Sequence, residues 1–424
     1  MAAVTTTTAT SVADICRSAR RAARELAQVD TARKDAALTA ISRALIARTD
    51  EILAANAQDM ESGRESGLSD ALLDRLALDE DRIGGIARAV EQIVALPDPV
   101  GEVIEGRRLP NGLDVRKVRV PLGVVAVVYE ARPNVTIDAT ALCLKSGNAI
   151  VLRGSSTAAH SNAVLARIAA EAVVGAGLPE GCVSLVAGGG REELAELATQ
   201  SETVDLIIPR GGEGLKAALG EVATVPVIYA ASGNCHVYVD ASADLDQAEK
   251  IVMNAKTQRP GVCNAAETLL VHEAVANTFL ERIVPSLIAA GVSLRADVRT
   301  REIASAVLQE ASDEDWATEY LALTLAVGVV DSVGDAIDHI GRYGSGHSEA
   351  IVTRDTAAAR AFQLGVDAAC VYVNASTRFT DGGEFGMGAE IGNSTQKLHA
   401  RGPIGLRELC TFKYLVTGDG HVRG

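Results

Sequence analysis

The sequence predicts an α/β protein with two parallel-sheet domains and a small separate β element. Short β-branched runs alternate with alanine-rich helical stretches in two successive series, one over about 120–232 and one over about 233–400. The predicted strands are apolar on both faces, which is typical of parallel strands covered by helices. The length of 424 residues also exceeds what a single hydrophobic core usually supports. Two α/β domains follow from these observations.

The elements outside the two series have patterns of their own. From about residue 11 to 96, apolar side chains recur at three- and four-residue spacing, which predicts helices. A Pro-Asn-Gly turn at 110–112 lies between flanks of alternating polarity and predicts a hairpin over 103–119, followed by a buried strand at 123–129. The chain closes on an apolar strand in "PIGLRELCTFKYLV". This strand and the hairpin would be exposed edges unless another subunit covered them.

Composition disfavours several classes of function. The net charge of −15 and the aromatic content of 3% disfavour nucleic acid, because phosphates would be repelled and few rings could stack on bases. No apolar run reaches the length of a membrane span. The seven cysteines form no CxxC pair and no Cys/His cluster at zinc spacing, so neither a disulfide framework nor a metal site is expected. A small-molecule ligand and a cytoplasmic location are expected instead.

Polar residues gather where the strands of the first series end. Arg153, Ser155 and Ser156 follow the strand in "AIVLRGSS" and place a guanidinium and two hydroxyls at one turn, a combination that suits a phosphate. A solvated turn with an incidental arginine is the alternative. The other strand ends carry glycines, namely Gly188, Gly211 and Gly212. Ligands of parallel sheets bind at such ends, although the GxGxxG fingerprint of dinucleotide cradles is absent.

The stretch "QRPGVCNAAET" holds a cysteine in polar surroundings. Most lone cysteines are buried and behave as small apolar residues, and Cys143 and Cys182 fit that description. Cys263 instead follows Arg259 and a Pro-Gly pair, precedes Asn264, and leads to the strand in "TLLVH". Exposure beside cationic or donor groups lowers the pKa of a thiol and makes it a nucleophile. Cys263 is therefore the candidate nucleophile.

Four long motifs resemble the gamma-glutamyl phosphate reductase family, a branch of the aldehyde dehydrogenase superfamily: "VPLGVVAVVYEARPNVTIDA", "QRPGVCNAAETLLVH", "AIDHIGRYGSGHSEAI" and "VYVNASTRFTDGGEFGMGAEIG". They occur in the family's order and spacing, and the likeness covers about residues 12–423. It implies an aldehyde dehydrogenase-like fold with two Rossmann-like domains and a small β oligomerisation element. It also implies the NADPH-dependent reduction of L-glutamyl 5-phosphate to L-glutamate 5-semialdehyde and phosphate through a cysteinyl thioester, in proline biosynthesis.

The resemblance divides the chain by function. Residues 1–102 and 120–232 are expected to form the cofactor-binding domain, and residues 233–400 the catalytic domain. Residues 103–119 and 401–424 are expected to form an oligomerisation hairpin and terminal strand, which makes a homo-oligomer the expected assembly.

The resemblance also assigns roles to single residues. Cys263 matches the nucleophile, and Asn134 matches the asparagine whose amide helps to form the oxyanion hole. Arg153 matches the position where many relatives place a lysine against the adenosine ribose and phosphate, and Glu319 resembles the glutamate that holds the nicotinamide ribose. Ser156 stands where NAD-preferring relatives often have an acid. A neutral residue does not repel a 2′-phosphate, so NADP is the expected cofactor.

The roles of several other polar residues stay open. Arg132 and Arg378 are candidates to bind the substrate through its carboxylate or its leaving phosphate, and a structural ion pair is the alternative for each. His339 and His347 are expected to be structural rather than proton-transfer groups. Glu267, four residues after the nucleophile, is expected to be a local salt-bridge partner rather than a base.

One departure from the superfamily bears on the reaction. Hydrolytic aldehyde dehydrogenases keep a glutamate about thirty residues before the cysteine to activate water, whereas this sequence has Ala231 there. The difference favours phosphate chemistry and reduction over an NAD(P)-dependent semialdehyde dehydrogenase that oxidises an aldehyde to an acid, which is the alternative enzyme. A catalytically silent scaffold is the alternative outside enzymes. Functional coupling to a glutamate 5-kinase is a further expectation.

Overall fold

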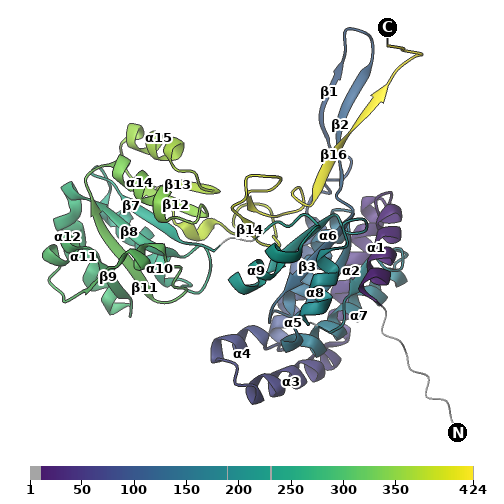
Figure 1. The fold of residues 1–424 in the computed structure, drawn as a ribbon, viewed down its shortest axis with the longest axis horizontal. Helices are drawn as coiled ribbons and strands as arrows, with labels where there is room; N and C mark the ends of the chain where they lie inside the picture. The colour runs from purple at the N-terminus through teal and green to yellow at the C-terminus, as the bar shows by residue number, and fades with distance from the viewer. Residues whose placement is uncertain (1–10, 189, 230–231, 424) are drawn as a thin grey trace. The chain divides into compact units, whose positions relative to one another are not determined.

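The structure, a computed structural model, divides the chain into two compact units (Figure 1). It describes residues 11–188, 190–229 and 232–423. Unit 1 comprises the described residues within Met1–Tyr229, Met387–Gly392 and Ile404–Gly424. Unit 2 comprises the described residues within Ala230–Gly386 and Asn393–Pro403. Both units contain a parallel sheet, as the sequence predicts.

Unit 1 is built on a four-stranded parallel sheet with the strand order β5-β4-β3-β6. Its strands are β3 (Val124–Tyr129), β4 (Ala149–Gly154), β5 (Val183–Leu185) and β6 (Leu206–Arg210). Every residue of the two central strands, β3 and β4, is buried. Strands that are covered on both faces must be apolar throughout, which is the pattern read from the sequence. The predicted buried strand at 123–129 is therefore confirmed.

The predicted helical segment from 11 to 96 is confirmed as five helices: α1 (Val12–Leu26), α2 (Thr31–Ala47), α3 (Thr49–Glu65), α4 (Asp70–Leu76) and α5 (Glu80–Ala95). Side-chain oxygens cap the first turns of four of them, namely those of Ser11, Asp30, Ser69 and Asp79. The helices after the sheet strands are α6 (Asn134–Lys145), α7 (Ala159–Gly175), α8 (Arg191–Ala198) and α9 (Glu213–Val222), with a 3-10 turn at Ser156–Ala158.

A separate antiparallel sheet contains the predicted hairpin. Strand β1 (Val103–Arg108) pairs with β2 (Asp114–Pro121), and β2 pairs along its whole length with β16 (Cys410–Thr417). The hairpin is confirmed, and the terminal strand completes the same sheet. Figure 1 shows this sheet extending away from the helices of unit 1. The residues of β16 after Cys410 are exposed, and β1 and β16 form the two edges of the sheet.

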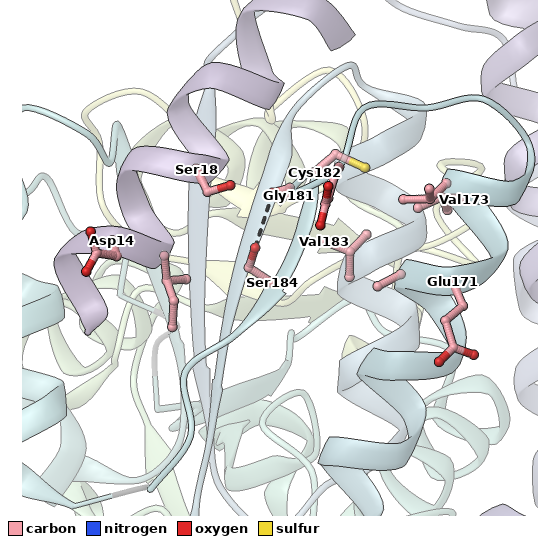
Figure 2. Close-up of a pocket in the computed structure, with 12 residues that line it drawn as sticks. Asp14, Ser18, Glu171, Val173, Gly181, Cys182, Val183 and Ser184 are labelled. Atoms are coloured by element: carbon pink, nitrogen blue, oxygen red, sulfur yellow. Dashed lines mark hydrogen bonds between the residues drawn. The ribbon is translucent and has the colours of Figure 1, made fainter. Parts of the chain in front are cut away.

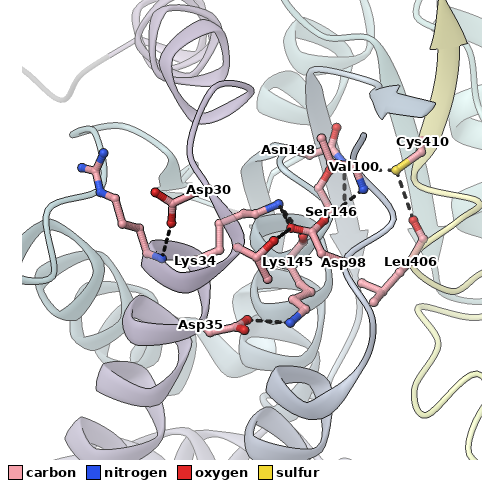
Figure 3. A network of polar contacts seen from close by, with 12 residues as sticks. Asp30, Lys34, Asp35, Asp98, Val100, Lys145, Ser146, Asn148, Leu406 and Cys410 are labelled. Atoms are coloured by element: carbon pink, nitrogen blue, oxygen red, sulfur yellow. Dashed lines mark hydrogen bonds and ion pairs between the residues drawn. The ribbon is translucent and has the colours of Figure 1, made fainter. Parts of the chain in front are cut away.

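A buried group of charges joins the helices of unit 1 (Figure 3). Lys34 of α2 pairs with Asp98 at 2.5 Å, and the two side chains are only 1% and 8% exposed. Lys145, at the end of α6, pairs with Asp35 at 2.5 Å and donates a hydrogen bond to the carbonyl oxygen of Val94. Lys34 Nζ also donates to the carbonyl oxygen of Lys145. Buried charges are stable when they are paired and hydrogen-bonded in this way.

One side chain beside these charges links the two sheets of unit 1. Asn148, which precedes β4, donates from Nδ2 to the carbonyl oxygen of Leu409 at 2.8 Å. Its Oδ1 accepts a hydrogen bond from the backbone N–H of Gly123, also at 2.8 Å. Leu409 lies directly before β16 and Gly123 directly before β3. The amide of Asn148 therefore fixes the start of the terminal strand against the start of the central parallel strand.

Unit 2 is built on a seven-stranded parallel sheet with the strand order β10-β9-β11-β8-β7-β12-β13. Its strands are β7 (Cys235–Val239), β8 (Ala266–His272), β9 (Ser293–Ala296), β10 (Gln309–Glu310), β11 (Thr324–Val330), β12 (Ser348–Val352) and β13 (Cys370–Val373). A short antiparallel pair consists of β14 (Asn393–Ser394) and β15 (Gly402–Pro403). The second α/β series predicted from the sequence is therefore confirmed.

Helices cover both faces of the sheet in unit 2. They are α10 (Leu245–Thr257), α11 (Glu273–Ala289), α12 (Val298–Ile303), α13 (Asp313–Ala317), α14 (Val333–Tyr343) and α15 (Thr356–Gly365), with a 3-10 turn at Thr377–Phe379. Val237 and Val239 of β7 pack in one core with α10 and α11, whereas Tyr238 packs in the other with α14 and α15. Across the described parts of both units, no helix is both long and apolar enough to cross a membrane.

The Lys34–Asp98 pair leads to a prediction about stability. Replacing Lys34→Met leaves the Asp98 carboxylate buried without its cation, so we expect the free energy of unfolding to fall by about 3–5 kcal/mol. Urea unfolding followed by circular dichroism measures the change. Arg17→Met is the control, because the Arg17–Asp14 pair is exposed and water replaces the lost contact. Equal stability of the two variants would contradict a stabilising role for the buried pair.

Candidate active site

Unit 2 places Cys263 in the loop between α10 and β8, at the amino end of a strand in the middle of the sheet. The other six cysteines are buried, whereas Cys263 is only partly buried. The contrast between Cys263 and the apolar cysteines, which the sequence predicts, is therefore present in the structure.

The backbone of Cys263 is held closely against Gly233. A Cβ atom at position 233 would lie 1.4 Å from the carbonyl oxygen of Cys263, so only glycine can occupy that position. The N–H of Gly233 donates to Glu319 Oε1 at 2.7 Å. The Sγ of Cys235 contacts the same Cys263 carbonyl oxygen at 3.2 Å. Glu319, predicted to bind the cofactor, therefore supports the segment against which Cys263 lies.

Asn264 fixes the loop on its other side. Its Nδ2 donates to the carbonyl oxygens of Thr380, at 2.9 Å, and Arg378, at 3.3 Å. Its own carbonyl oxygen accepts from Thr377 Oγ1 at 2.7 Å. The turn at 377–380 and the loop that carries Cys263 are thus joined by hydrogen bonds. The structure thus brings the segment that carries Arg378 close to Cys263.

Glu267 lies in a buried ion pair. Its Oε2 is 2.5 Å from Lys256 Nζ, both side chains are fully buried, and its Oε1 accepts from the N–H of Leu321. Burial raises the pKa of Glu267 to about 7, and the ammonium of Lys256 opposes this shift. Burial also lowers the pKa of Lys256. Both carboxylate oxygens are engaged, so the prediction of a salt-bridge partner is confirmed.

Two histidines of unit 2, His339 and His347, have lowered pKa values. Burial lowers the pKa of His347 to about 4, and Nδ1 of this ring lies 2.8 Å from Ser348 Oγ. Burial lowers the pKa of His339 to about 3, and its ring contacts those of Trp316 and Tyr343. Neutral rings in such contacts fit the structural role expected for both histidines. Within the described residues, no three His, Cys, Asp or Glu side chains are placed to hold a metal ion.

Unit 1 gathers the predicted cofactor residues at the carboxyl ends of its strands. Arg153 ends β4 almost fully buried, and its Nη2 donates to the carbonyl oxygen of Gly190 at 2.6 Å. Burial lowers the pKa of Arg153, and the nearby carboxylate of Glu193 opposes this shift. Within the described residues, Arg153 Nε, Ser155 Oγ and Glu193 Oε2 are buried without a hydrogen-bond partner. Buried polar atoms need partners, so these three atoms suit a polar ligand such as a nucleotide.

The glycines predicted for the same site have different surroundings. Gly188 has a φ of +109°, which favours glycine, and an added Cβ would lie 2.6 Å from Glu193 Oε1. Gly211 packs against Glu130, and the N–H of Gly212 donates to Glu130 Oε2 at 3.2 Å. Glu130 therefore already accepts from the backbone N–H before α9 to which a phosphate would otherwise bind. Gly188 instead packs against Glu193, the carboxylate that also acts on Arg153.

Asn134 is the first residue of α6 and is exposed. Its Nδ2 donates to Asp138 Oδ2, one helical turn further on, at 2.9 Å. Burial raises the pKa of Asp138 to about 6, and the hydrogen bond from Asn134 and the charge of Arg210 oppose this shift. The carboxylate thus orients the amide that the sequence assigns to the oxyanion hole. Arg132 lies in the turn directly before this helix.

A separate hollow in unit 1 contains none of these residues (Figure 2). It has a volume of about 460 Å³ and lies among α1, α7 and β5. Side chains of Asp14, Glu171 and Glu180 line it beside small and apolar groups. Carboxylates repel anionic ligands, so this hollow does not suit a nucleotide or an acyl phosphate.

Several residues of these sites were not identified from the sequence. Asp138 and Glu193 are ordinary helical acids in the sequence, and only the fold shows which amide or guanidinium they face. Gly233 and Cys235 lie about thirty residues from the nucleophile and carry no motif of their own. Arg259 could have been identified as a site residue from the sequence, because it is part of the "QRPGVC" motif. Ala231, where the sequence lacks the hydrolytic glutamate, lies outside the described residues.

Residues 1–301 match the Aldehyde dehydrogenase family. The chain belongs to this family. An acetylating aldehyde dehydrogenase from Geobacillus thermoglucosidasius shares the fold at 19% identity, with a TM-score of 0.70 over 97% of each chain. The aldehyde dehydrogenase-like α/β fold expected from the sequence is thereby confirmed.

More similar relatives are gamma-glutamyl phosphate reductases. The one from Thermobifida fusca is 57% identical over 412 residues, which are 97% of this chain and 98% of the relative. The one from Heliobacterium modesticaldum is 56% identical over 407 residues, covering 96% and 97%. The crystal structure of the one from Thermotoga maritima superposes with a TM-score of 0.95 at 48% identity, over 97% of this chain and 100% of that one. The resemblance read from the four motifs is therefore confirmed.

The buried pair of Lys256 and Glu267 leads to a second prediction. Replacing Glu267→Gln leaves the ammonium of Lys256 buried without an anion, so we expect the free energy of unfolding to fall by about 3–5 kcal/mol. The double variant Lys256→Met/Glu267→Leu should recover most of this loss, because apolar side chains can replace a buried pair. Urea unfolding measures both. Unchanged stability in the single variant, with loss of thiol alkylation at Cys263, would show that Glu267 acts on the thiol instead.

Proposed function

We propose that this chain reduces L-glutamyl 5-phosphate to L-glutamate 5-semialdehyde and phosphate with NADPH, the second step of proline biosynthesis from glutamate. The observation that carries the proposal is the placement of Cys263. It is the one cysteine that is not buried, and its loop is fixed on both sides by Gly233 and Asn264. The high identity to gamma-glutamyl phosphate reductases over nearly the whole chain supports the choice of substrate.

The first chemical step assigned to the chain is capture of the acyl group. The thiolate of Cys263 attacks the acyl carbon, and phosphate leaves to give a thioester on the sulfur. The backbone N–H of Cys263 and the amide of Asn134 are the donors proposed for the developing oxyanion, each contributing on the order of 3 kcal/mol. Asp138 holds the amide of Asn134 in one orientation, so less conformational entropy is lost when the amide binds the oxyanion.

The thioester must then avoid hydrolysis. Water attacks a thioester efficiently when a general base is close, and the sequence has Ala231 where hydrolytic relatives keep that base. Glu267, the nearest carboxylate in sequence after the nucleophile, accepts from Lys256 and from the N–H of Leu321. Neither position supplies a base. These features favour reduction over oxidation to an acid.

The nicotinamide cofactor supplies the hydride when it is bound. We assign its binding to Arg153, Ser155, Ser156, Gly188 and Glu319. Gly211 and Gly212 stay predictions, because Glu130 accepts from the N–H of Gly212. Arg153 and Ser155 have buried polar atoms without partners among the described residues, which fits a nucleotide phosphate. The neutral Ser156 beside a guanidinium supports NADP over NAD, because neither group repels a 2′-phosphate.

The wider assembly is also proposed. Side chains of Phe412, Tyr414 and Val416 are about half exposed on the edge strand β16, which supports pairing with a second copy of the chain. Substrate binding by Arg132, the cytoplasmic location and coupling to a glutamate 5-kinase stay predictions.

The reaction can be tested in the reverse direction. With glutamate semialdehyde and NADP, we expect NADPH formation to depend strictly on added phosphate, because phosphate must cleave the thioester. Cys263→Ala should abolish turnover while the urea midpoint stays close to that of the wild type. Equal rates without phosphate would support the alternative semialdehyde dehydrogenase. Turnover by Cys263→Ala would exclude this cysteine as the nucleophile.

Cofactor preference gives a separate prediction. Replacing Arg153→Met should raise the dissociation constant of NADPH by about 10- to 100-fold, because a charge-assisted hydrogen bond to the 2′-phosphate is lost. The constant for NADH should change little. Fluorescence titration of both nucleotides measures binding without turnover. Ser156→Glu is the matched variant and should weaken NADPH selectively, whereas an equal effect on both nucleotides would contradict the assignment.

A further inference from the structure

Arg378 is held in a fixed place beside the nucleophile. The turn that carries it is bound to Asn264, the residue after Cys263, through Thr377 and Thr380. Its Nε donates to Gln258 Oε1 at 2.8 Å, so the side chain is tied to the start of the nucleophile loop as well. The Nε edge of the guanidinium is engaged in this contact. The Nη edge presents the geometry that matches two oxygens of an anion.

Arg259 brings a second guanidinium to the same place. It follows Gln258 directly, and its charge is close enough to lower the pKa of Arg378, in addition to the larger effect of burial. Cys263 and Asp381 act on Arg378 in the opposite direction. Arg378 thus interacts electrostatically with a second guanidinium, with Cys263 and with one carboxylate, that of Asp381. Like charges repel, and an anionic ligand relieves that repulsion.

We infer that Arg259 and Arg378 together hold the phosphate group of the acyl phosphate beside the Cys263 sulfur. The inference rests on the function proposed above and gives Arg259 a role that had not been assigned to it. It also decides the open role of Arg378 in favour of the phosphate. The phosphate is bonded to the carbon that the sulfur attacks, whereas the α-carboxylate lies at the far end of the substrate. Two guanidiniums also match the two negative charges of a phosphate better than the single charge of a carboxylate.

The pair acts on the leaving group. Attack by the thiolate forms the S–C bond and breaks the C–O bond to phosphate, with no change in oxidation state. The electron pair of the broken bond leaves on the phosphate oxygen, and the departing phosphate takes one proton from water. Negative charge grows on the phosphate during this step, so fixed cations beside it stabilise the transition state.

Phosphate kinetics in the reverse direction test the inference. We expect Arg378→Gln and Arg259→Gln each to raise the KM for inorganic phosphate by roughly 10- to 100-fold, with the KM for glutamate semialdehyde nearly unchanged. Arg378→Lys should recover part of the loss, since it restores the charge without the paired donors. Arg354→Gln is the control, because Arg354 follows the carboxyl end of β12, at the opposite end of the sheet from Cys263. A rise in the semialdehyde KM alone would overturn the inference in favour of the α-carboxylate.

Alkylation of Cys263 tests the site without turnover. Inorganic phosphate should slow the reaction of Cys263 with iodoacetamide in the wild type and in Arg354→Gln, but not in Arg259→Gln/Arg378→Gln. Chloride at the same ionic strength controls for screening, and alkylation without phosphate shows that each variant keeps its loop. Protection that persists in the double variant would overturn the anion site. Protection in a wild-type protein that lacks phosphate-dependent turnover would support the site and refute the proposed function.

Discussion

The burial of both faces of each parallel sheet is the constraint on which the rest of the structure depends. Strands β3 and β4 have no exposed residue, so they carry almost no polar groups along their length. Polar side chains must therefore collect where strands begin and end. Unit 1 gathers its arginine and hydroxyls at the carboxyl ends of strands, and unit 2 holds Cys263 at the amino end of β8. Chemistry is confined to the rims of the two sheets.

The rim residues that the sequence predicts are those with a local signal. Cys263 stands out because its neighbours are polar, and Arg153 because two hydroxyls follow it in the same turn. The contacts that hold them come from remote segments: Gly233 and Thr377 reach the nucleophile loop through the order of strands in the sheet. The pairing of β16 with β2 joins segments almost 300 residues apart, and nothing in either strand specifies the partner. The sequence pattern alone predicts helices and strands, whereas strand register and packing decide which distant segments come into contact.

Charged side chains in unit 2 occur in two arrangements with different consequences. Lys256 and Glu267 are fully buried and paired, which fixes the chain before and after Cys263. Arg259 is exposed and Arg378 is partly buried, and their like charges repel each other. A protein whose only requirement was stability would not favour the second arrangement. Comparing the two arrangements separates residues that support the loop from residues proposed to bind the substrate.

The discontinuity of unit 1 also bears on how the polypeptide folds during synthesis. Its strand β16 is synthesised after the last residues of unit 2. The strands of unit 2 are therefore all synthesised while unit 1 still lacks one, and one side of β2 stays unpaired until β16 has been made. A chain that is cut short before β16 keeps the loop that carries Cys263 but leaves the sheet of β1 and β2 without its third strand. The pairing of β16 with β2 thus depends on a segment that is synthesised after that loop.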